Sequence, residues 1–404
     1  MMVPTKTTKQ TPRLGRAFTA ALHGVEARLV TVEANIGPGL PGVSVVGMGD
    51  TAVRESRDRI KTAAGNSGLS WPRTKVVISM SPASLPKAGS GFDLAMALAV
   101  LSAQRPSSRL EGALVIGEIG LDGTVREVNG VLPAALAASS LGFSQIVVPP
   151  GNAAEAAVLS TLEVLVAPTL ADAWAWAEGK KDLPQARPAP APDRRPVADM
   201  RDVSGQHEAR YALEVAAAGG HHMMMVGPPG SGKSMLAARL PGILPTLTEQ
   251  EMLEATAVHS VAGLVKAGPV VHAPFVAPHH TVSRAGLIGG GAGHPRPGAV
   301  SLAHRGVLFL DEVSEVPAHV LDGLRQPLET GEVELSRVRS QVISPGVFPA
   351  RHGSQPLPLW RRRGLALHVQ CHGAAPLLGQ CLRAIDRPHR YQDPHERIGC
   401  GGWC

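Results

Sequence analysis

The sequence predicts two mixed α/β domains joined by a proline-rich linker. Apolar runs of strand length alternate with helical runs up to about Gly179, and the alternation begins again near Asp202. Between these parts, the segment LPQARPAPAPDRRPVA (183–198) combines proline with charge, which is typical of an extended linker. A glycine-rich loop in the second part lies between an apolar run and a helical run, so we expect the functional chemistry there.

The strands and helices of the first domain follow from hydrophobic patterning. ARLVTVEANI (27–36) and TKVVISMS (74–81) predict strands, and FDLAMALAVLSA (92–103) predicts a buried helix. ALVIGEIG (113–120) and SQIVVP (144–149) predict further strands. Because these strands alternate with helical segments, the expected fold is a mixed α/β domain.

The sequence argues against a membrane-spanning helix. Of the 404 residues, 44% are hydrophobic but only 3% are aromatic, so the cores must be aliphatic. No apolar run reaches the roughly 18 residues of a membrane-spanning helix. The basic N-terminus also lacks the apolar region of a secretory signal. We therefore expect a cytoplasmic protein with no membrane partner, and a disordered N-terminus over residues 1–13.

The net charge of +6 gives little support for nucleic-acid binding. From Ser344 to Cys404 there are eight Arg, no Lys and three acidic residues, so most of the excess lies in this tail. All four cysteines lie there too, at spacings that fit no zinc ribbon: Cys371, Cys381, Cys400 and Cys404.

The sharpest motif is GPPGSGKS (227–234), which follows the apolar run HMMMV (222–226) and precedes MLAARLPGIL (235–244). Strand, glycine loop and helix in this order form the context of a P-loop. Its glycines let backbone N–H groups turn toward a phosphate, its lysine supplies a positive charge, and its last hydroxyl can bind Mg²⁺. The expected nucleotide-binding residues are Gly227, Pro228, Pro229, Gly230, Ser231, Gly232, Lys233 and Ser234.

An apolar strand that ends in acidic residues should complete such a site, and GVLFLDE (306–312) supplies it. Asp311 then lies at the carboxyl end of a strand, where open α/β sheets bind ligands. We expect Asp311 to bind Mg²⁺ together with Ser234. Glu312 is expected to activate the attacking water as general base, so Glu312 and Lys233 are the expected catalytic residues.

Several segments, in order, resemble the magnesium-chelatase-like AAA+ ATPases of the YifB/ComM type. They include DVSGQHEARYALEVAAAGG, HSVAG, PFVAPHHT, RPGAVSLAHRGVLFLDE and LRQPLETGEVELSR, and the resemblance extends from about Leu14 to Arg339. It implies an N-terminal α+β domain like that of Lon protease (ribosomal S5 domain 2-like) over 14–180 and a linker over 181–200. An AAA+ P-loop NTPase α/β domain, incomplete in this chain, is implied over 201–342.

The resemblance also implies ATP and Mg²⁺ as cofactors and a homo-oligomer, a hexameric ring in the intact family. The implied role is DNA remodelling during recombination or competence, with DNA as a partner. Two alternatives stay open: a chelatase-type motor for metal insertion into a tetrapyrrole, and a non-enzymatic binding module that acts through the N-terminal domain.

The N-terminal domain is expected to have no peptidase activity. A Lon-type site needs a serine nucleophile and a lysine that accepts its proton. In the segments that resemble Lon, Gly91 stands where the serine should be and Leu132 where the lysine should be. Ser90 lies one position away, but no lysine follows between 129 and 150.

Histidines near the expected site allow two interpretations. His279 and His280 could form a metal-binding pair or a polar loop beside the nucleotide. His259 and His304 are expected to be ordinary hydrogen-bonded histidines.

The resemblance stops near residue 340. Codons compatible with His352–Trp360, shifted by one base, can encode Met-Ala-Ala-Asn-Pro-Cys-Pro-Cys-Gly, a family-like segment. We therefore expect residues 343–404 to be an out-of-frame, disordered tail. The hypothesis implies that the sheet of the second domain lacks its central strand, that this domain is unstable, and that ATP hydrolysis is impaired because the family's sensor and arginine segments are lost.

Overall fold

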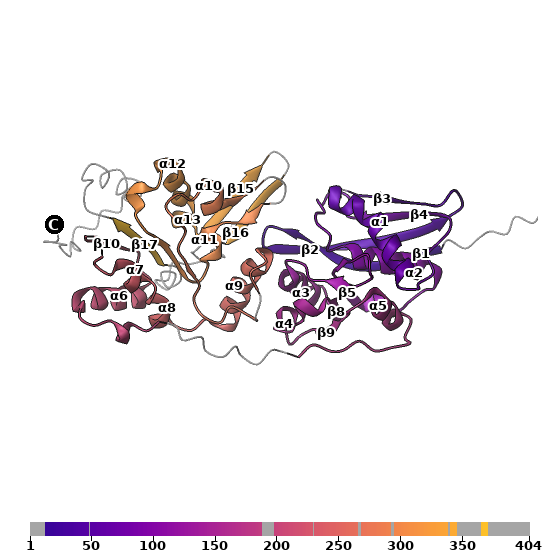
Figure 1. Ribbon diagram of the computed structural model, residues 1–404, viewed down its shortest axis with the longest axis horizontal. Helices are drawn as coiled ribbons and strands as arrows, with labels where there is room; N and C mark the ends of the chain where they lie inside the picture. Colours follow the sequence, from indigo (N-terminus) through magenta and orange to yellow (C-terminus); the bar gives the residue numbers. More distant parts are fainter. Residues whose placement is uncertain are drawn as a thin grey trace, which may run out of the picture.

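Two α/β domains lie end to end in the computed structural model (Figure 1). No helix within the described part of the chain is both long and apolar enough to span a membrane. The structure describes residues 13–47, 49–187, 198–228, 230–265, 268–291, 295–337, 340–345 and 365–370.

A seven-stranded sheet forms the centre of the first domain, in the order β3-β4-β2-β1-β5-β8-β9. The neighbours β1, β2 and β4 are antiparallel, whereas β3, β5, β8 and β9 join in parallel. The short pair β6 (Glu118–Ile119) and β7 (Val125–Arg126) lies outside this sheet. The bounds are β1 (Arg13–His23), β2 (Glu26–Gly37), β3 (Gly42–Val46), β4 (Lys75–Ser81), β5 (Ala113–Val115), β8 (Gln145–Val148) and β9 (Glu163–Val166).

Helices cover both faces of this sheet, because successive strand residues point to opposite sides. Ala17 and Ala21 of β1 belong to the apolar cluster that contains α1, α2 and α5, whereas Ala20 belongs to the cluster that contains α3 and α4. The domain therefore has three layers. Its helices are α1 (Thr51–Asn66), α2 (Asp93–Gln104), α3 (Val131–Ser140), α4 (Ala153–Ala156) and α5 (Leu170–Ala177).

Close approach of α2 to β1 depends on a glycine. A Cβ atom at Gly15 would lie 2.2 Å from the Ala99 carbonyl oxygen and 2.3 Å from the Ala103 nitrogen. Only glycine lets the strand and helix backbones come this near. The helix is buried around almost its whole circumference, so this contact lies at the centre of the domain.

The second domain is built on a parallel sheet in the order β10-β17-β14-β11. All four residues of β14 are buried, as expected for a strand covered on both faces. Val307 and Phe309 pack on one face and Leu308 and Leu310 on the other. The strands are β10 (Met223–Val226), β11 (Phe275–Val276), β14 (Val307–Leu310) and β17 (Leu365–Gln370), with the pairs β12 (Gly289–Gly290) and β13 (Arg296–Pro297), and β15 (Glu332–Arg337) and β16 (Ser340–Pro345).

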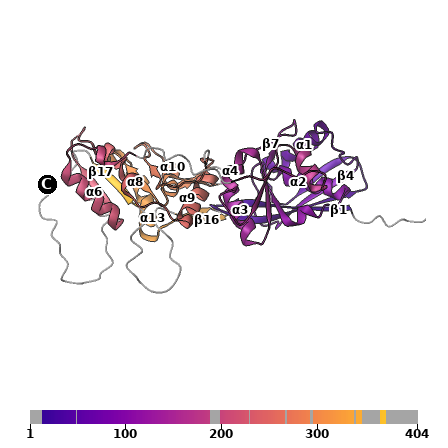
Figure 2. The same cartoon turned by 90° about the horizontal axis from the view of Figure 1, so that it is seen from below.

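Two groups of helices cover this sheet. One group, α6 to α8, packs with β10 and one face of β14, and the other, α10 to α12, packs on the opposite face. Figure 2 shows that α9 lies at the end of the domain nearest α3 and α4. The helices are α6 (His207–Gly219), α7 (Lys233–Ala237), α8 (Leu240–Ile243), α9 (Glu249–Val261), α10 (Arg284–Ile288), α11 (Ala299–Leu302), α12 (Ala318–Leu321) and α13 (Arg325–Thr330).

Most elements predicted from patterning are present with small shifts. β2, β4, α2 and β8 confirm four of the predictions in the first domain. The predicted strand 113–120 is divided into β5 and β6, and the predicted helix 235–244 is divided between α7 and α8, where Pro241 begins a new turn.

The prediction of a missing central strand is wrong for the described sheet. β17 lies between β10 and β14 and pairs in parallel with each, through residues 367–370 and 365–368 respectively. The backbone N–H and C=O groups of two neighbouring strands therefore find partners, which removes the stated physical reason for an unstable sheet. Within the expected disordered tail 343–404, residues 365–370 form β17, and the other residues after 345 lie outside the described residues.

Candidate functional site

The expected phosphate loop connects β10 to α7. Gly230 has φ 79° and Gly232 has φ 86°, so both occupy the left-handed region that favours glycine. At Gly227, an added Cβ would lie 3.1 Å from the Ser231 hydroxyl. The backbone conformation of the loop thus favours glycine at these positions. Pro229, also expected in this site, lies outside the described residues.

Lys233 folds back over the loop that precedes it. Its Nζ donates to the carbonyl oxygens of Gly227 and Pro228, both at 2.9 Å. The Ser231 hydroxyl lies 3.4 Å away. An anion held in this loop must therefore compete with two carbonyl groups for the lysine.

Ser234 and Asp311 meet although they lie far apart in the sequence. The Ser234 hydroxyl donates to Asp311 Oδ2 at 2.8 Å, and the Glu312 N–H donates to Asp311 Oδ1 at 3.0 Å. The contact forms because β10 and β14 run parallel, which brings their carboxyl ends to one edge of the sheet. Two hard oxygen ligands, of the kind that Mg²⁺ prefers, thus face each other.

Glu312 lies beside Asp311 in an uncommon backbone conformation. Its φ is 48°, in the left-handed region that non-glycine residues seldom occupy. Its Oε2 lies 3.3 Å from Nδ1 of His280, and about half of the Glu312 side chain (48%) is exposed. The carboxylate is thus accessible and is held by one neighbour.

His280 is a site residue whose contact sequence reasoning missed. It follows β11, which pairs in parallel with β14, so its position at the same sheet edge could have been inferred from the apolar run before it. The rings of His279 and His280 stack with centroids 4.0 Å apart, and His279 Nδ1 lies 2.9 Å from the Thr281 hydroxyl. Among the described residues, no group of three or more metal-ligating side chains surrounds this pair.

An ion-pair cluster anchors the segment that leads into β14. Glu254 of α9 accepts from Arg305 Nε at 2.8 Å and lies 3.2 Å from His304 Nε2. Hydrogen bonds from His304 and then Arg305 lower the pKa of Glu254 to about 2, despite its partial burial. His259 Nε2 lies 2.9 Å from the Leu302 carbonyl, so His259 and His304 are hydrogen-bonded as expected.

The residues at the expected peptidase positions do not form a serine–lysine dyad. Leu132 is fully buried in α3. The Ser90 hydroxyl donates to the Glu118 carboxylate. Lys87, the nearest lysine in sequence, is buried with its Nζ bonded to the carbonyls of Pro82 and Leu85.

The second domain thus has the sheet and loop of P-loop NTPase-like proteins. The family model described as magnesium chelatase, subunit ChlI, matches residues 199–354, and a second, described as subunit ChlI of Mg-chelatase, matches residues 32–152. The first match ends at residue 354, beyond the point near residue 340 where the resemblance was expected to stop. Assignment of the chain to this family does not depend on where the match ends.

Comparisons with individual proteins agree. An uncharacterized protein of Mycobacterium tuberculosis is 49% identical over 349 residues, which cover 85% of this chain and 69% of that protein. YifB of Salmonella typhimurium is 42% identical (87% and 70% covered), and the competence protein ComM of Haemophilus influenzae is 39% identical (85% and 69% covered). The chain therefore belongs to the magnesium-chelatase-like family of YifB and ComM.

Two similarities cover smaller parts of the chain. Lon protease 2 of Bacillus subtilis is 30% identical over 182 residues, 39% of this chain and 31% of that protein. The DNA repair protein RadA of Halalkalibacterium halodurans is 36% identical over 82 residues, 20% of this chain and 18% of that protein.

Proposed function

We propose that this chain is an ATP-binding, magnesium-dependent AAA+ protein, and the hydrogen bond between Ser234 and Asp311 supports this most strongly. It joins the last residue of the glycine loop to the first acidic residue after β14. The donor set fits Mg²⁺, which prefers oxygen ligands and binds through one or two carboxylates plus phosphate. The glycine conformations at 230 and 232 and the lysine at 233 fit a phosphate chain.

Each residue of the site has a distinct role in this proposal. Lys233 exchanges its bonds to the Gly227 and Pro228 carbonyls for the phosphates. Ser234 and Asp311 would hold the metal ion, and Glu312 accepts a proton from the attacking water. When bound, Mg²⁺ supplies positive charge that stabilises the transferring phosphoryl group.

His280 sets the position of Glu312 in this mechanism. A carboxylate held 3.3 Å from an imidazole nitrogen has a preferred direction. The contact aims the exposed carboxylate at the attacking water. His280 acts through Glu312 and is therefore a positioning residue.

Turnover is proposed to be slow in this chain. The family model match ends at residue 354, and the segment expected to carry the charge-stabilising arginine is not recognisable after it. Such an arginine contributes about 10³–10⁵ in rate in other phosphoryl-transfer proteins. Nucleotide binding depends on residues 227–234 and 311, so it should be retained.

We further propose that the chain assembles into a ring and acts on DNA, as a motor of recombination or competence. Support comes from the similarity to ComM, a competence protein, and to RadA, a DNA repair protein. A Lon-like N-terminal domain without peptidase chemistry is part of the same proposal and is supported by the match to Lon protease 2.

A second candidate function is a chelatase-type motor, which the similarity to the magnesium chelatase family model favours.

The deciding experiment is a titration with a fluorescent ATP analogue, with Mg²⁺ and with EDTA. We expect saturable binding that is stronger with Mg²⁺. Purified, folded chain that shows no binding at millimolar nucleotide would refute the proposal. Turnover stimulated by branched DNA favours the recombination motor, whereas turnover stimulated only by a porphyrin-binding partner favours the chelatase.

A further inference from the structure

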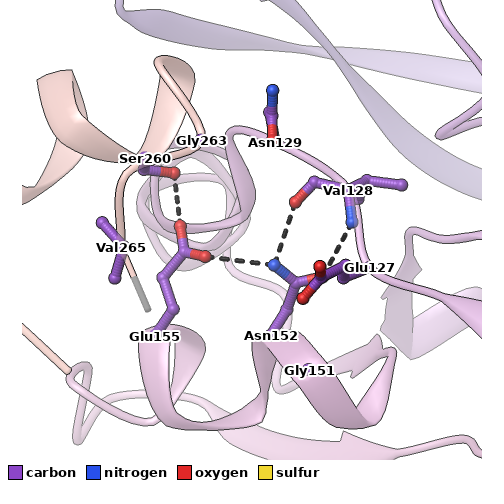
Figure 3. A pocket seen from close by; sticks show the side chains of 9 residues that line it. All are labelled: Glu127, Val128, Asn129, Gly151, Asn152, Glu155, Ser260, Gly263 and Val265. Carbon is purple, nitrogen blue, oxygen red and sulfur yellow. Dashed lines mark hydrogen bonds between the residues drawn. The ribbon is translucent and has the colours of Figure 1, made fainter. Parts of the chain in front are cut away.

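The two domains contact each other beside a polar cavity of about 380 Å³ (Figure 3). The contact joins α3 of the first domain to α9 of the second. The cavity is lined by residues from both domains, among them Glu127, Asn152 and Glu155 from the first and Ser260 and Gly263 from the second. The cavity thus lies at the boundary between the two domains.

Ser260, in the last turn of α9, makes two hydrogen bonds across this boundary. Its hydroxyl donates to Glu155 Oε1 (Figure 3). Its carbonyl accepts from the Gly130 N–H at 3.1 Å. Ser260 is 2% exposed and Glu155 is 5% exposed, so water does not replace these bonds easily. The packing is also close at Gly263, where an added Cβ would lie 2.8 Å from the Asn129 Oδ1.

Glu155 is held in place from its own domain. The Leu132 N–H donates to Oε1 at 2.9 Å, and Asn152 Nδ2 donates to Oε2 at 3.2 Å. Burial raises the pKa of Glu155, while the hydrogen bond from Ser260 and the bonds from Leu132 and Asn152 oppose that rise. Loss of Ser260 therefore removes one of the donors that compensate a buried carboxyl group.

The opposite face of α9 is attached to the segment before β14. Glu254 binds Arg305 and His304, and His259 binds the Leu302 carbonyl. β14 starts two residues after Arg305 and ends directly before Asp311. A rigid helix and a short buried strand thus connect the carboxylates of the candidate nucleotide site to the domain boundary.

We propose that the Ser260–Glu155 contact is a latch, through which the nucleotide site controls how firmly the two domains are joined. This rests on the proposed function. Nucleotide with Mg²⁺ must displace the Lys233 bonds to Gly227 and Pro228 and place a metal ion against the paired Ser234 and Asp311 oxygens, so the end of β14 must adjust. The adjustment passes through Glu254 to α9 and weakens the latch. By linkage, a weaker latch must then strengthen nucleotide binding.

Hydrogen exchange of the full chain, measured by mass spectrometry, tests this directly. The reporter is the peptide that contains residues 127–132, because the Gly130 and Leu132 amides donate to Ser260 and Glu155. We expect saturating MgATP to increase exchange of this peptide at least threefold in the wild type. A parallel titration with the fluorescent analogue reports nucleotide binding independently.

Two latch variants, Ser260→Ala and Glu155→Gln, separate coupling from loss of folding, because the second keeps size and shape. Both should exchange faster without nucleotide, respond no further to MgATP, and bind it about fivefold more tightly, within the usual range of coupling. The matched control is Ser140→Ala, an exposed serine of α3 whose hydroxyl donates to the Ala137 carbonyl within its own helix.

MgATP that binds the wild type without changing exchange at 127–132 would overturn the latch and leave the proposed function intact. Latch variants that bind nucleotide with wild-type affinity would overturn it as well. Absence of binding in the titration would overturn both proposals.

Discussion

Nδ1 of His280 lies 3.3 Å from Oε2 of Glu312, across 32 positions of sequence. The two residues follow neighbouring parallel strands, β11 and β14, whose carboxyl ends share one edge of the sheet. Glu312 is the candidate general base, and the direction of its carboxylate therefore depends on His280.

Replacement of His280 should change turnover more than nucleotide affinity. We expect His280→Ala to reduce the single-turnover rate of ATP hydrolysis about tenfold, with Kd for MgATP within twofold, because the carboxylate loses its direction. His280→Asn, which can still donate to the carboxylate, should recover part of the rate. His319→Ala, an exposed histidine on α12, is the control, and an equal loss in this variant would contradict the role of His280.

Removal of the lysine charge should weaken nucleotide binding without unfolding the chain. Charged hydrogen bonds contribute roughly 1.5–3 kcal/mol, so Lys233→Ala should raise the Kd for MgATP about 10- to 100-fold. The measurement is the fluorescent-analogue titration, with circular dichroism to check folding. Lys181→Ala, which removes an exposed ion pair with Asp172, should bind like the wild type. Unchanged affinity in Lys233→Ala would exclude this loop as the phosphate site.

Ser234 and Asp311 should act as one unit. We propose a double-mutant cycle with Ser234→Ala and Asp311→Asn. Each variant removes one of the two oxygen ligands that share a metal ion, so the two losses of MgATP affinity should be non-additive. The losses should nearly vanish in EDTA, where no metal ion bridges the pair and the phosphate. Additive losses, or losses of the same size in EDTA, would argue that the two residues do not share a metal ion. Isothermal titration calorimetry measures all four proteins.

The Glu254 cluster should give the second domain an acid-sensitive stability. The pKa of Glu254 is about 2 in the folded chain and near 4.5 otherwise, so the unfolded chain takes up the proton first as the pH falls. This stabilisation is fully present above about pH 4.5 and is lost progressively toward pH 2.

Glu254→Gln removes that contribution. We expect it to lower the free energy of unfolding by about 3 kcal/mol at pH 7, since it leaves the buried Arg305 guanidinium less compensated. The difference from wild type should shrink as the pH approaches 3 in thermal melts. A constant difference across this range would show that the carboxylate charge is not the cause.

The sequence predicted local elements well where hydrophobic pattern and burial agree. The apolar runs of β14 and α2 leave few alternatives for buried segments. The strand β1 was missed because RLGRAFTAALH mixes charged, small and aromatic residues, and its strand form depends on pairing with β2 along its whole length.

Contacts between distant residues were harder to predict. We could place the glycine loop and its lysine beside the acidic end of β14, because the strands of a parallel sheet have their carboxyl ends at one edge. Glu155 and Ser260 are 105 positions apart in different domains, and neither lies in a recognisable motif. β17 was missed because its position depends on pairing with two other strands and not on a local signal.

The close approach at Gly15 restricts what evolution can do with the first domain. An alanine there would place a methyl carbon 2.2 Å from the Ala99 carbonyl oxygen, nearer than any non-bonded pair tolerates. Relatives with a side chain at the equivalent position must therefore have a displaced helix α2. A substitution at this glycine is tolerated only together with changes in that helix.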